Sequence, residues 1–283
     1  MSAPTFTVLL LCWNHADFLE TCIGSLMEQS DEDFEIVFLD NCSTDGSFEK
    51  AERLFAASGK AVTMIRNEQP ENVPENCQRL LKRANSDLVS LLSTDDWYQP
   101  TYIEQMKKAS LAHPEAVWLY PSITHFLEET KQHVRKPDFN YRSGDISSET
   151  RKLEWNVGFL GICYRTDALR AIGGWDPNMI MEDTDLIYRL SQVGQCVHVP
   201  EYLVNYRISA NAMTKNLVLM SSAWELFFNK YKADFPDRNR KLASYNKTYT
   251  LMALKRGKFS AFLRLLSRTA KFGLRSLAFD RGR

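Results

Sequence analysis

Three apolar runs, each of which stops in a polar cluster that holds Asn or Asp, constrain the fold of this chain more than any other feature. Phe6 to Leu11 ends at Cys12-Trp13-Asn14-His15, Phe34 to Leu39 ends at Asp40-Asn41, and Leu88 to Leu92 runs into Ser93-Thr94-Asp95-Asp96. Amphipathic helical patterns lie between these runs. Strand, turn, helix and strand in this order open a βαβ unit, so we expect an α/β fold with a mostly parallel, Rossmann-like sheet flanked by helices.

The three polar clusters should form one site. In an open parallel sheet the carboxyl ends of the strands line a single crevice, and ligands bind there. We therefore expect Asn14, Asp40, Asn41, Asp95 and Asp96 to lie close together in space.

The part of the chain that follows Asp96 gives weaker signals. We expect a strand from Ala116 to Tyr120, a long irregular segment from His125 to Lys152, a strand from Gly158 to Tyr164 and a last short strand from Cys196 to Val199. Glu182-Asp183 opens a predicted helix. From Leu217 onward the pattern is helical.

Composition excludes several classes of protein. The chain has 283 residues, of which 44% are hydrophobic and 25% charged, values that exclude disordered, collagenous and coiled-coil proteins. No run approaches the roughly 18 apolar residues of a membrane-spanning helix, and no secretory leader is recognisable. The six cysteines are scattered without metal-binding spacing, as expected for reduced, mostly buried thiols. We expect a cytoplasmic protein, soluble or peripheral to a membrane.

Charge is distributed unevenly along the chain. From Arg238 to the end there are 13 Lys or Arg residues and one acid, so a tail of net charge +12 follows a body of net charge −12. Within the tail, residues 258–277 place Phe259, Phe262, Leu263, Leu266 and Ala270 at helical spacing, with Arg264, Arg268, Lys271 and Arg275 on another face. This basic amphipathic helix could bind an anionic membrane surface or pack on the acidic body of the chain.

The acidic pairs each allow a structural and a functional interpretation. Asp95-Asp96 fits an ordinary turn, but adjacent carboxylates at a strand end also favour a divalent cation or a hydroxyl-rich ligand. Asp40-Asn41 fits a turn before a helix, or an acceptor for the imide N–H of a pyrimidine base. Glu182-Asp183 can complement a helix dipole, or supply a general base to a hydroxyl nucleophile.

Other catalytic patterns are missing from the sequence. It contains no phosphate-binding Gly-x-x-x-x-Gly-Lys loop, dinucleotide-binding glycine motif, nucleophile elbow or zinc-protease motif. The five histidines have no metal-like spacing, and we interpret each as structural or exposed. We expect no nucleic-acid partner.

Taken in order, these motifs resemble family 2 glycosyltransferases with the GT-A fold. The match runs from Cys12-Trp13-Asn14 through Asp40-Asn41-Cys42-Ser43-Thr44-Asp45-Gly46-Ser47 and Thr94-Asp95-Asp96 to Gly173-Gly174-Trp175-Asp176 and Glu182-Asp183. It covers about residues 5–210. A GT-A nucleotide-sugar-binding and catalytic domain is accordingly expected over residues 1–215, with a helical, basic extension over residues 216–283.

The resemblance implies inverting transfer from a nucleotide-diphosphate sugar, with Mg²⁺ or Mn²⁺ at the diphosphate. A UDP-sugar is the favoured donor, and a glycan or lipid-linked hydroxyl is the acceptor, as in the synthesis of cell-surface polysaccharides. The nucleotide base would be held by Leu11, Trp13, Asn14, Asp40 and Asn41, and Asp95 and Asp96 would share ribose contact and metal ligation. Asp183 and its neighbour Glu182 would form the catalytic pair, in which Asp183 is the general base. Arg207 would lie near the diphosphate or the acceptor.

The sequence departs from the family pattern at three positions. Ser93 stands where an additional Asp is common, Asn41 replaces a frequent Asp, and Ser209 stands where many members have a His. Two other functions stay open: a non-catalytic GT-A module that binds a nucleotide sugar or acts as a scaffold, and a nucleotidyltransferase. A nucleotidyltransferase would want a Gly-rich, basic loop after the first strand, which this sequence lacks. The identities of sugar and acceptor depend on geometry that residue types alone do not encode.

Overall fold

The computed structural model describes residues 5–136, 140–208 and 216–281, with side chains described up to residue 276. Its strands, in chain order, are β1 Phe6–Cys12, β2 Glu35–Asp40, β3 Val62–Arg66, β4 Leu88–Ser93, β5 Trp97–Tyr98, β6 Ala116–Leu127, β7 Gln132–Arg135, β8 Cys163–Arg165 and β9 Gln195–Ile208. Its helices are α1 Leu19–Met27, α2 Ser47–Ser58, α3 Val73–Leu81, α4 Tyr102–Ala112, α5 Ser147–Lys152, α6 Thr166–Ala171, α7 Glu182–Ser191, α8 Leu217–Lys230, α9 Arg238–Lys255 and α10 Phe259–Arg281.

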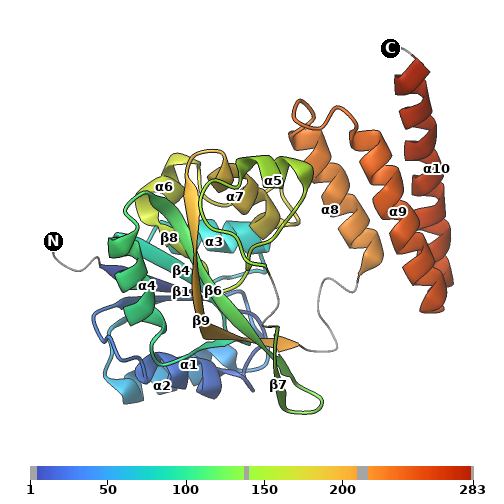
Figure 1. Cartoon of the computed structure of the whole chain (residues 1–283). Coiled ribbons are helices and arrows are strands. Elements are labelled where there is room, and N and C mark those ends of the chain that lie inside the picture. Colours follow the sequence, from blue (N-terminus) through green and yellow to red (C-terminus); the bar gives the residue numbers. More distant parts are fainter. Residues whose placement is uncertain (1–4, 137–139, 209–215, 282–283) are drawn as a thin grey trace. The chain divides into compact units, whose positions relative to one another are not determined.

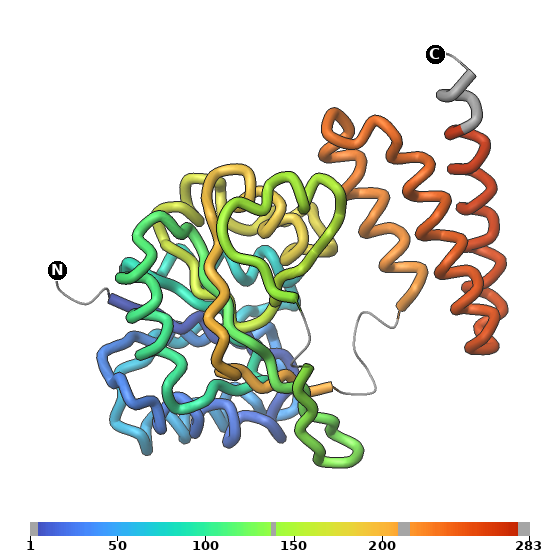
Figure 2. The backbone as a smooth tube through the Cα atoms, in the orientation of Figure 1, coloured from blue at the N-terminus to red at the C-terminus, as the bar shows by residue number. Residues whose placement is uncertain are grey.

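The described strands form one mixed sheet with the order β3-β2-β1-β4-β8-β6-β9-β5, and β7 pairs with β6 at its margin. The first four strands in this order are parallel to one another, whereas β8 is antiparallel to both β4 and β6. Strands β6 and β9 then run parallel and side by side (Figure 2). The predicted α/β fold class, a mostly parallel sheet flanked by helices with a helical C-terminal region, is confirmed.

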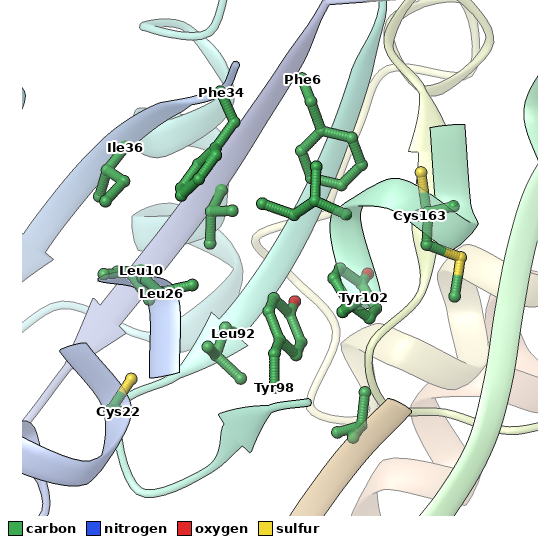
Figure 3. Close-up of a cluster of buried hydrophobic side chains, with 14 of the residues drawn as sticks. Phe6, Leu10, Cys22, Leu26, Phe34, Ile36, Leu92, Tyr98, Tyr102 and Cys163 are labelled. Atoms are coloured by element: carbon green, nitrogen blue, oxygen red, sulfur yellow. The ribbon is translucent and has the colours of Figure 1, made fainter. Parts of the chain in front are cut away.

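Helices cover both faces of the sheet (Figure 1). Alternate residues of β1 point to opposite faces, as the period of a strand requires. Phe6, Val8 and Leu10 pack with α1, α2 and α4, and Figure 3 shows this cluster from Phe6 to Tyr102. Leu9 faces the other side, where α3, α6 and α7 pack. Burial on both faces explains why the strand is a continuous apolar run.

The chain separates into two compact units. One consists of Met1–Pro177 with Glu182–Ser209, and the other of Asn178–Met181 with Ala210–Arg283. The second unit contains α8, α9 and α10, which pack around Leu217, Ala253 and Leu265. The predicted division at residue 215 stays a prediction, because residues 209–215, Ser209 among them, lie outside the described residues.

The expectations for the chain between residues 116 and 208 were partly wrong. The segment from His125 to Lys152 is not irregular throughout, because β6 continues to Leu127 and both β7 and α5 follow. Likewise β9 extends from Gln195 to Ile208, well beyond the short strand that we expected. Long-range pairing between β6 and β9 fixes these polar stretches as strands, and local propensity does not report such pairing.

The strand expected from Gly158 to Tyr164 is also shorter than predicted. Only Cys163–Arg165 forms β8, because Gly161 adopts a left-handed φ of +61°. A Cβ atom at this glycine would lie 2.2 Å from Cγ2 of Val204. The backbone therefore turns here and passes close to β9.

No helix in the described part of the chain combines the length and apolar character that crossing a membrane requires.

Candidate functional site

Strand register brings the three polar clusters to one edge of the sheet. Cys12 pairs with Asp40, and Leu11 pairs with Ser93, so β1, β2 and β4 end at the same level. The loops that follow these strands therefore meet, as the parallel topology requires.

Hydrogen bonds fasten the loop after β1 to the loop after β2. Asn14 has a left-handed φ of 54°, which places its backbone N–H 2.8 Å from Oγ of Ser43. Its Oδ1 accepts a hydrogen bond from the N–H of Thr44 at 2.9 Å. Trp13 stands out from this fastened pair of loops with 56% of its surface exposed, so its ring is available to stack on a ligand.

Asp40 and Asn41 differ in the hydrogen-bonding capacity that they retain. Oδ1 of Asn41 already accepts from Nδ2 of Asn67 at 2.9 Å and from the N–H of Glu71 at 2.8 Å. Asn41 therefore shapes the loop after β3. Asp40 is fully buried, and one oxygen accepts from the N–H of Ser43 while Oδ1 has no hydrogen-bond partner among the described residues. Asp40 is thus the member of the pair with an acceptor oxygen left over.

Asp95 and Asp96 follow β4 and lie in contrasting surroundings. The side chain of Asp95 is 28% exposed, although its Oδ1 is buried and makes no hydrogen bond within the described residues. Asp96 is buried, and its Oδ1 accepts from the backbone N–H of Arg207 at 2.8 Å. Burial and the negative charge of Asp95 together raise the pKa of Asp96 well above its usual range.

This pair of carboxylates fits the oxygen ligands that Mg²⁺ and Mn²⁺ prefer. The orphaned oxygen of Asp95 and the raised pKa of Asp96 both indicate negative charge that the protein alone leaves uncompensated. Across the described residues no group of three or more His, Cys, Asp or Glu side chains could hold a metal ion. A cation held by Asp95 and Asp96 would thus need further ligands from water or from a bound molecule.

His15 also reaches this pair, which the sequence analysis missed. Its Nδ1 lies 3.0 Å from Oγ1 of Thr94 and 3.9 Å from Oδ1 of Asp95. Burial lowers the pKa of His15. The one available signal was its position in the loop after β1, since the spacing of the histidines indicated nothing.

Arg207, near the end of β9, is held in a cage of aromatic rings. Its guanidinium carbon lies 4.5 Å, 5.0 Å and 5.2 Å from the ring centres of Phe18, Trp97 and Phe126. Nε donates to the backbone carbonyl of Asp95 at 2.8 Å, and Nη1 pairs with the carboxylate of Glu128. In this structure Arg207 therefore contacts the Asp95–Asp96 loop from within the protein.

Glu182 and Asp183 begin α7, as predicted. Both are half-buried, and Oδ1 of Asp183 accepts from the N–H of Thr184 at 2.6 Å. Burial raises the pKa of Asp183 above its ordinary value. Burial, reinforced by the charge of Asp183, raises the pKa of Glu182 to about 7.

Tyr206 connects α7 with the loop after β4 electrostatically. Burial raises the pKa of Tyr206, and the charges of Asp96, Asp95 and Asp183 raise it further. One phenol therefore lies within the electrostatic reach of all three carboxylates. The charge of Asp183 thus acts on the same phenol as those of Asp95 and Asp96, although 87 residues separate Asp183 from Asp96 in the sequence.

A separate cavity of about 640 Å³ lies between α3 and the turn that follows α6. Gln78, Arg79 and Gly174 are among the residues that line it. None of the predicted site residues does so. The predicted site is instead an edge of the sheet formed by loops.

Comparison with solved structures identifies the fold as GT-A. The structure of S. aureus TarS 1–349 in complex with UDP-GlcNAc is similar with a TM-score of 0.66 at 15% identity, and the match covers 95% of this chain and 81% of that chain. The mannosyltransferase PcManGT from Pyrobaculum calidifontis, in complex with GDP-Man and Mn²⁺, is similar with a TM-score of 0.62 at 16% identity, covering 99% and 85% respectively. The mixed sheet and its flanking helices thus define a GT-A protein.

Sequence comparison then gives the family. The model described as glycosyl transferase family 2 matches residues 7–172, more than half of the chain, so this chain belongs to that family and is a glycosyltransferase. A curated relative, the amylovoran biosynthesis glycosyltransferase AmsE of Erwinia amylovora, is 24% identical over 74% of this chain and 79% of its own length. The predicted family is confirmed.

Proposed function

We propose that this glycosyltransferase transfers a sugar, with inversion, from a nucleotide-diphosphate sugar to a hydroxyl of a glycan or lipid-linked acceptor in the synthesis of a cell-surface polysaccharide. The observation that carries the proposal is the meeting of the loops after β1, β2 and β4, with Asp40, Asp95 and Asp96, at the carboxyl edge of the parallel strands. Ligands of open α/β sheets bind at this edge. Similar proteins support the reaction class, because TarS was solved with UDP-GlcNAc and PcManGT with GDP-Man.

The loops after β1 and β2 would bind the nucleoside. Trp13 offers an exposed ring for stacking, and Asp40 retains an acceptor oxygen that suits the imide N–H of uracil. Asn14 holds the two loops together, and Leu11 lies beside the β2 and β4 ends. Asn41 would act indirectly, since its amide oxygen already orders the loop after β3. A UDP-sugar is accordingly the favoured donor.

Asp95 and Asp96 would hold Mg²⁺ or Mn²⁺, and Asp95, the more exposed of the two, would also contact the ribose. A divalent cation bound there would neutralise the negative charge that develops on the departing diphosphate. His15 and Arg207 would keep the two carboxylates in place, because His15 contacts their loop from the loop after β1 and Arg207 contacts it from β9.

Asp183 would accept the proton of the acceptor hydroxyl as that oxygen attacks the anomeric carbon. A single displacement from the face opposite the diphosphate inverts the configuration, so no covalent nucleophile is needed. The raised pKa of Asp183 improves its strength as a base toward a hydroxyl, provided that the group is ionised at the working pH. Glu182, whose pKa is raised by burial and by the charge of Asp183, would keep its proton while Asp183 ionises.

A non-catalytic module that binds a nucleotide sugar or acts as a scaffold is the second candidate. It would require the nucleoside loops and could dispense with buried carboxylates at α7. The raised pKa values of Glu182 and Asp183 favour the enzyme, because perturbed carboxyl groups cluster at catalytic sites.

The second unit supports a proposal of peripheral binding at the inner face of the cell membrane. Four apolar side chains of α10 are strongly exposed, namely Phe259 at 67%, Leu263 at 49%, Leu266 at 46% and Leu274 at 69%. With 3.6 residues per turn they fall on one stripe of the helix. The exposed residues Arg264, Lys271 and Arg275 fall on an adjoining stripe. An apolar stripe beside a basic one is typical of helices that lie in a membrane interface.

The structure changes the membership of the predicted stripes. Phe262 packs with the buried cluster of the unit, and Arg268 pairs with Glu225 of α8. Lys271 also lies 3.3 Å from Glu225. The inner face of α10 therefore belongs to the helical unit, whereas Leu274 joins the outer apolar stripe.

Replacing Asp183 by Asn should lower turnover by about 10² to 10⁴-fold, the usual contribution of a general base. Donor affinity and the unfolding temperature should change little. Asp167→Asn is the matched control, since exposed Asp167 also opens a helix and accepts from the next backbone N–H, at 2.7 Å. Single-turnover rates per folded molecule are the measurement. An unaltered rate in Asp183→Asn, with a loss of stability, would show that the residue only caps α7.

The rate should also fall as the pH is lowered, since only ionised Asp183 can accept a proton. Burial raises the pKa of Asp183, so the midpoint of this fall in kcat/KM should lie clearly above about 3.9, the ordinary Asp value. Burial and the charge of Asp183 raise the pKa of Glu182 to about 7, so Glu182 keeps its proton while Asp183 ionises, and Glu182→Gln should move this midpoint only slightly. A midpoint at or below 4 in the unaltered enzyme, or a large shift of it in the variant, contradicts the assignment.

Chelation by EDTA should abolish transfer, and Mn²⁺ or Mg²⁺ should restore it, because the diphosphate and two carboxylates together carry a large negative charge. Asp96→Asn, which keeps an oxygen for the N–H of Arg207, should mimic chelation. Asp87→Asn at the opposite end of β4 is the control, since that exposed side chain binds Thr5. Donor affinity with and without metal, measured by calorimetry, completes the test. Full activity in excess EDTA would exclude the metal.

The protein should co-sediment with vesicles that contain anionic lipid, and high salt should weaken this binding. It should not co-sediment with vesicles of neutral lipid. Exchanging Arg264 and Arg275 for Gln should weaken binding by about tenfold or more, since each basic residue near an anionic surface contributes about 1 kcal/mol. Leu263→Ser with Leu274→Ser should also weaken it. The control pair is Lys108→Gln and Leu111→Ser on α4, which are exposed as well. Equal binding by all variants, or binding by none, counts against the proposal.

A further inference from the structure

Arg207 is positively charged and nearly buried, and its guanidinium contacts the backbone of the Asp95–Asp96 loop, where no ion pair with either carboxylate is found among the described residues. Its exposed fraction is 8%. Within the described residues, its ion pair is with Glu128, and none joins it to the carboxylate of Asp95 or Asp96. Its contacts with that loop use the carbonyl oxygen of Asp95 and the backbone N–H of Arg207 itself.

Glu128 is well suited to hold this guanidinium. It follows β6 directly, and its own N–H donates to the carbonyl of Ile208 at 3.3 Å, so the backbones of Glu128 and β9 are tied together. Its carboxylate pairs with both Lys131 and Arg207, and these contacts lower the pKa of Glu128. The residue therefore stays ionised, as a buried guanidinium requires of its partner.

Loss of the Glu128 charge would change what Arg207 does. A guanidinium cannot lose its proton, and a buried one without a counterion is costly, so it would turn to other carboxylates within reach. Those of Asp95 and Asp96 belong to the loop that Nε of Arg207 already contacts. An ion pair there would supply the positive charge that a divalent cation would otherwise provide.

We propose that Glu128 is a positioning residue of the donor site, which holds Arg207 away from the carboxylates of Asp95 and Asp96 and so keeps both free to bind a divalent cation. This inference rests on the proposed metal role of these two residues. It assigns a function to the turn between β6 and β7, which contributes no side chain to the site itself. The guanidinium of Arg207 then contacts the Asp95–Asp96 loop through the backbone carbonyl of Asp95, and the surrounding rings of Phe18, Trp97 and Phe126 restrict the positions that the guanidinium can adopt.

The test is the binding of Mn²⁺ alone to this chain. The electron paramagnetic resonance signal of free Mn²⁺ measures how much of the ion stays unbound. Glu128→Gln should weaken binding by about 10 to 100-fold, the usual effect of losing a residue that orients a metal ligand. Glu129→Gln, the same substitution at the exposed neighbour, should bind as the unaltered protein does. Equal binding by both variants overturns the inference.

A double-mutant cycle separates positioning from a general structural role. Arg207→Met fills the aromatic cage without charge, and Glu128→Gln should have no further effect on Mn²⁺ affinity in that background. The same weakening in both backgrounds would show that Glu128 does not act through Arg207. If Glu128→Gln fails to fold, Glu128→Asp keeps the charge but shortens its reach and should bind Mn²⁺ with intermediate affinity, whereas unchanged affinity overturns the inference.

Failure of the proposed function gives a different result. If the unaltered protein binds Mn²⁺ neither alone nor together with UDP, then Asp95 and Asp96 are not metal ligands, and both proposals fail. If it binds Mn²⁺ and Glu128→Gln binds equally well, only the role of Glu128 fails.

Discussion

Parallel pairing of β1 with β2 on one side and with β4 on the other is the interaction on which the rest of the site depends. It aligns Cys12 with Asp40 and Leu11 with Ser93, so three polar loops meet at one level. The pairing is possible because both faces of these strands are covered by helices, which bury their continuous apolar side chains. The apolar core and the polar edge are thus two consequences of the same register.

Negative charge accumulates at this edge, and the surrounding protein compensates only part of it. Asp96 has one oxygen held by the N–H of Arg207, yet burial and Asp95 still raise its pKa. The nearby guanidinium of Arg207 is paired with Glu128 instead. Unneutralised carboxylates lower the stability of the folded protein, but they attract a positively charged ligand. Functional sites often have this property.

Much of this architecture could be predicted from the sequence, because local pattern determined it. The runs that became β1, β2 and β4 are apolar and lead into polar clusters that hold Asn or Asp, and the helix at Glu182 starts with a cluster of acids. By contrast, β6 and β9 owe their length to pairing between residues about 80 positions apart, which no local pattern reports. The local pattern also did not indicate the left-handed φ of +61° at Gly161, where a side chain would collide with Val204 of β9.

The candidate site shows the same division. Asp95, Asp96 and Asp183 could be chosen because acids at strand and helix ends are conspicuous. The roles of His15 and Glu128 could not, since each becomes evident only through a contact with a distant segment, Thr94 in one case and Arg207 in the other. Asn41 was expected to contact the nucleotide base. Only the structure shows that its amide oxygen already accepts hydrogen bonds from Asn67 and Glu71.

The most direct test of the site is a crystal structure of this chain with UDP and Mn²⁺, in which the anomalous scattering of manganese locates the ion independently of the model. We expect one anomalous peak within about 2.5 Å of a carboxylate oxygen of Asp95 or Asp96, the range for hard divalent cations, with uracil at the loops after β1 and β2. A nucleotide bound at these loops with no manganese beside either carboxylate, or a nucleotide bound elsewhere on the protein, would contradict the assignment.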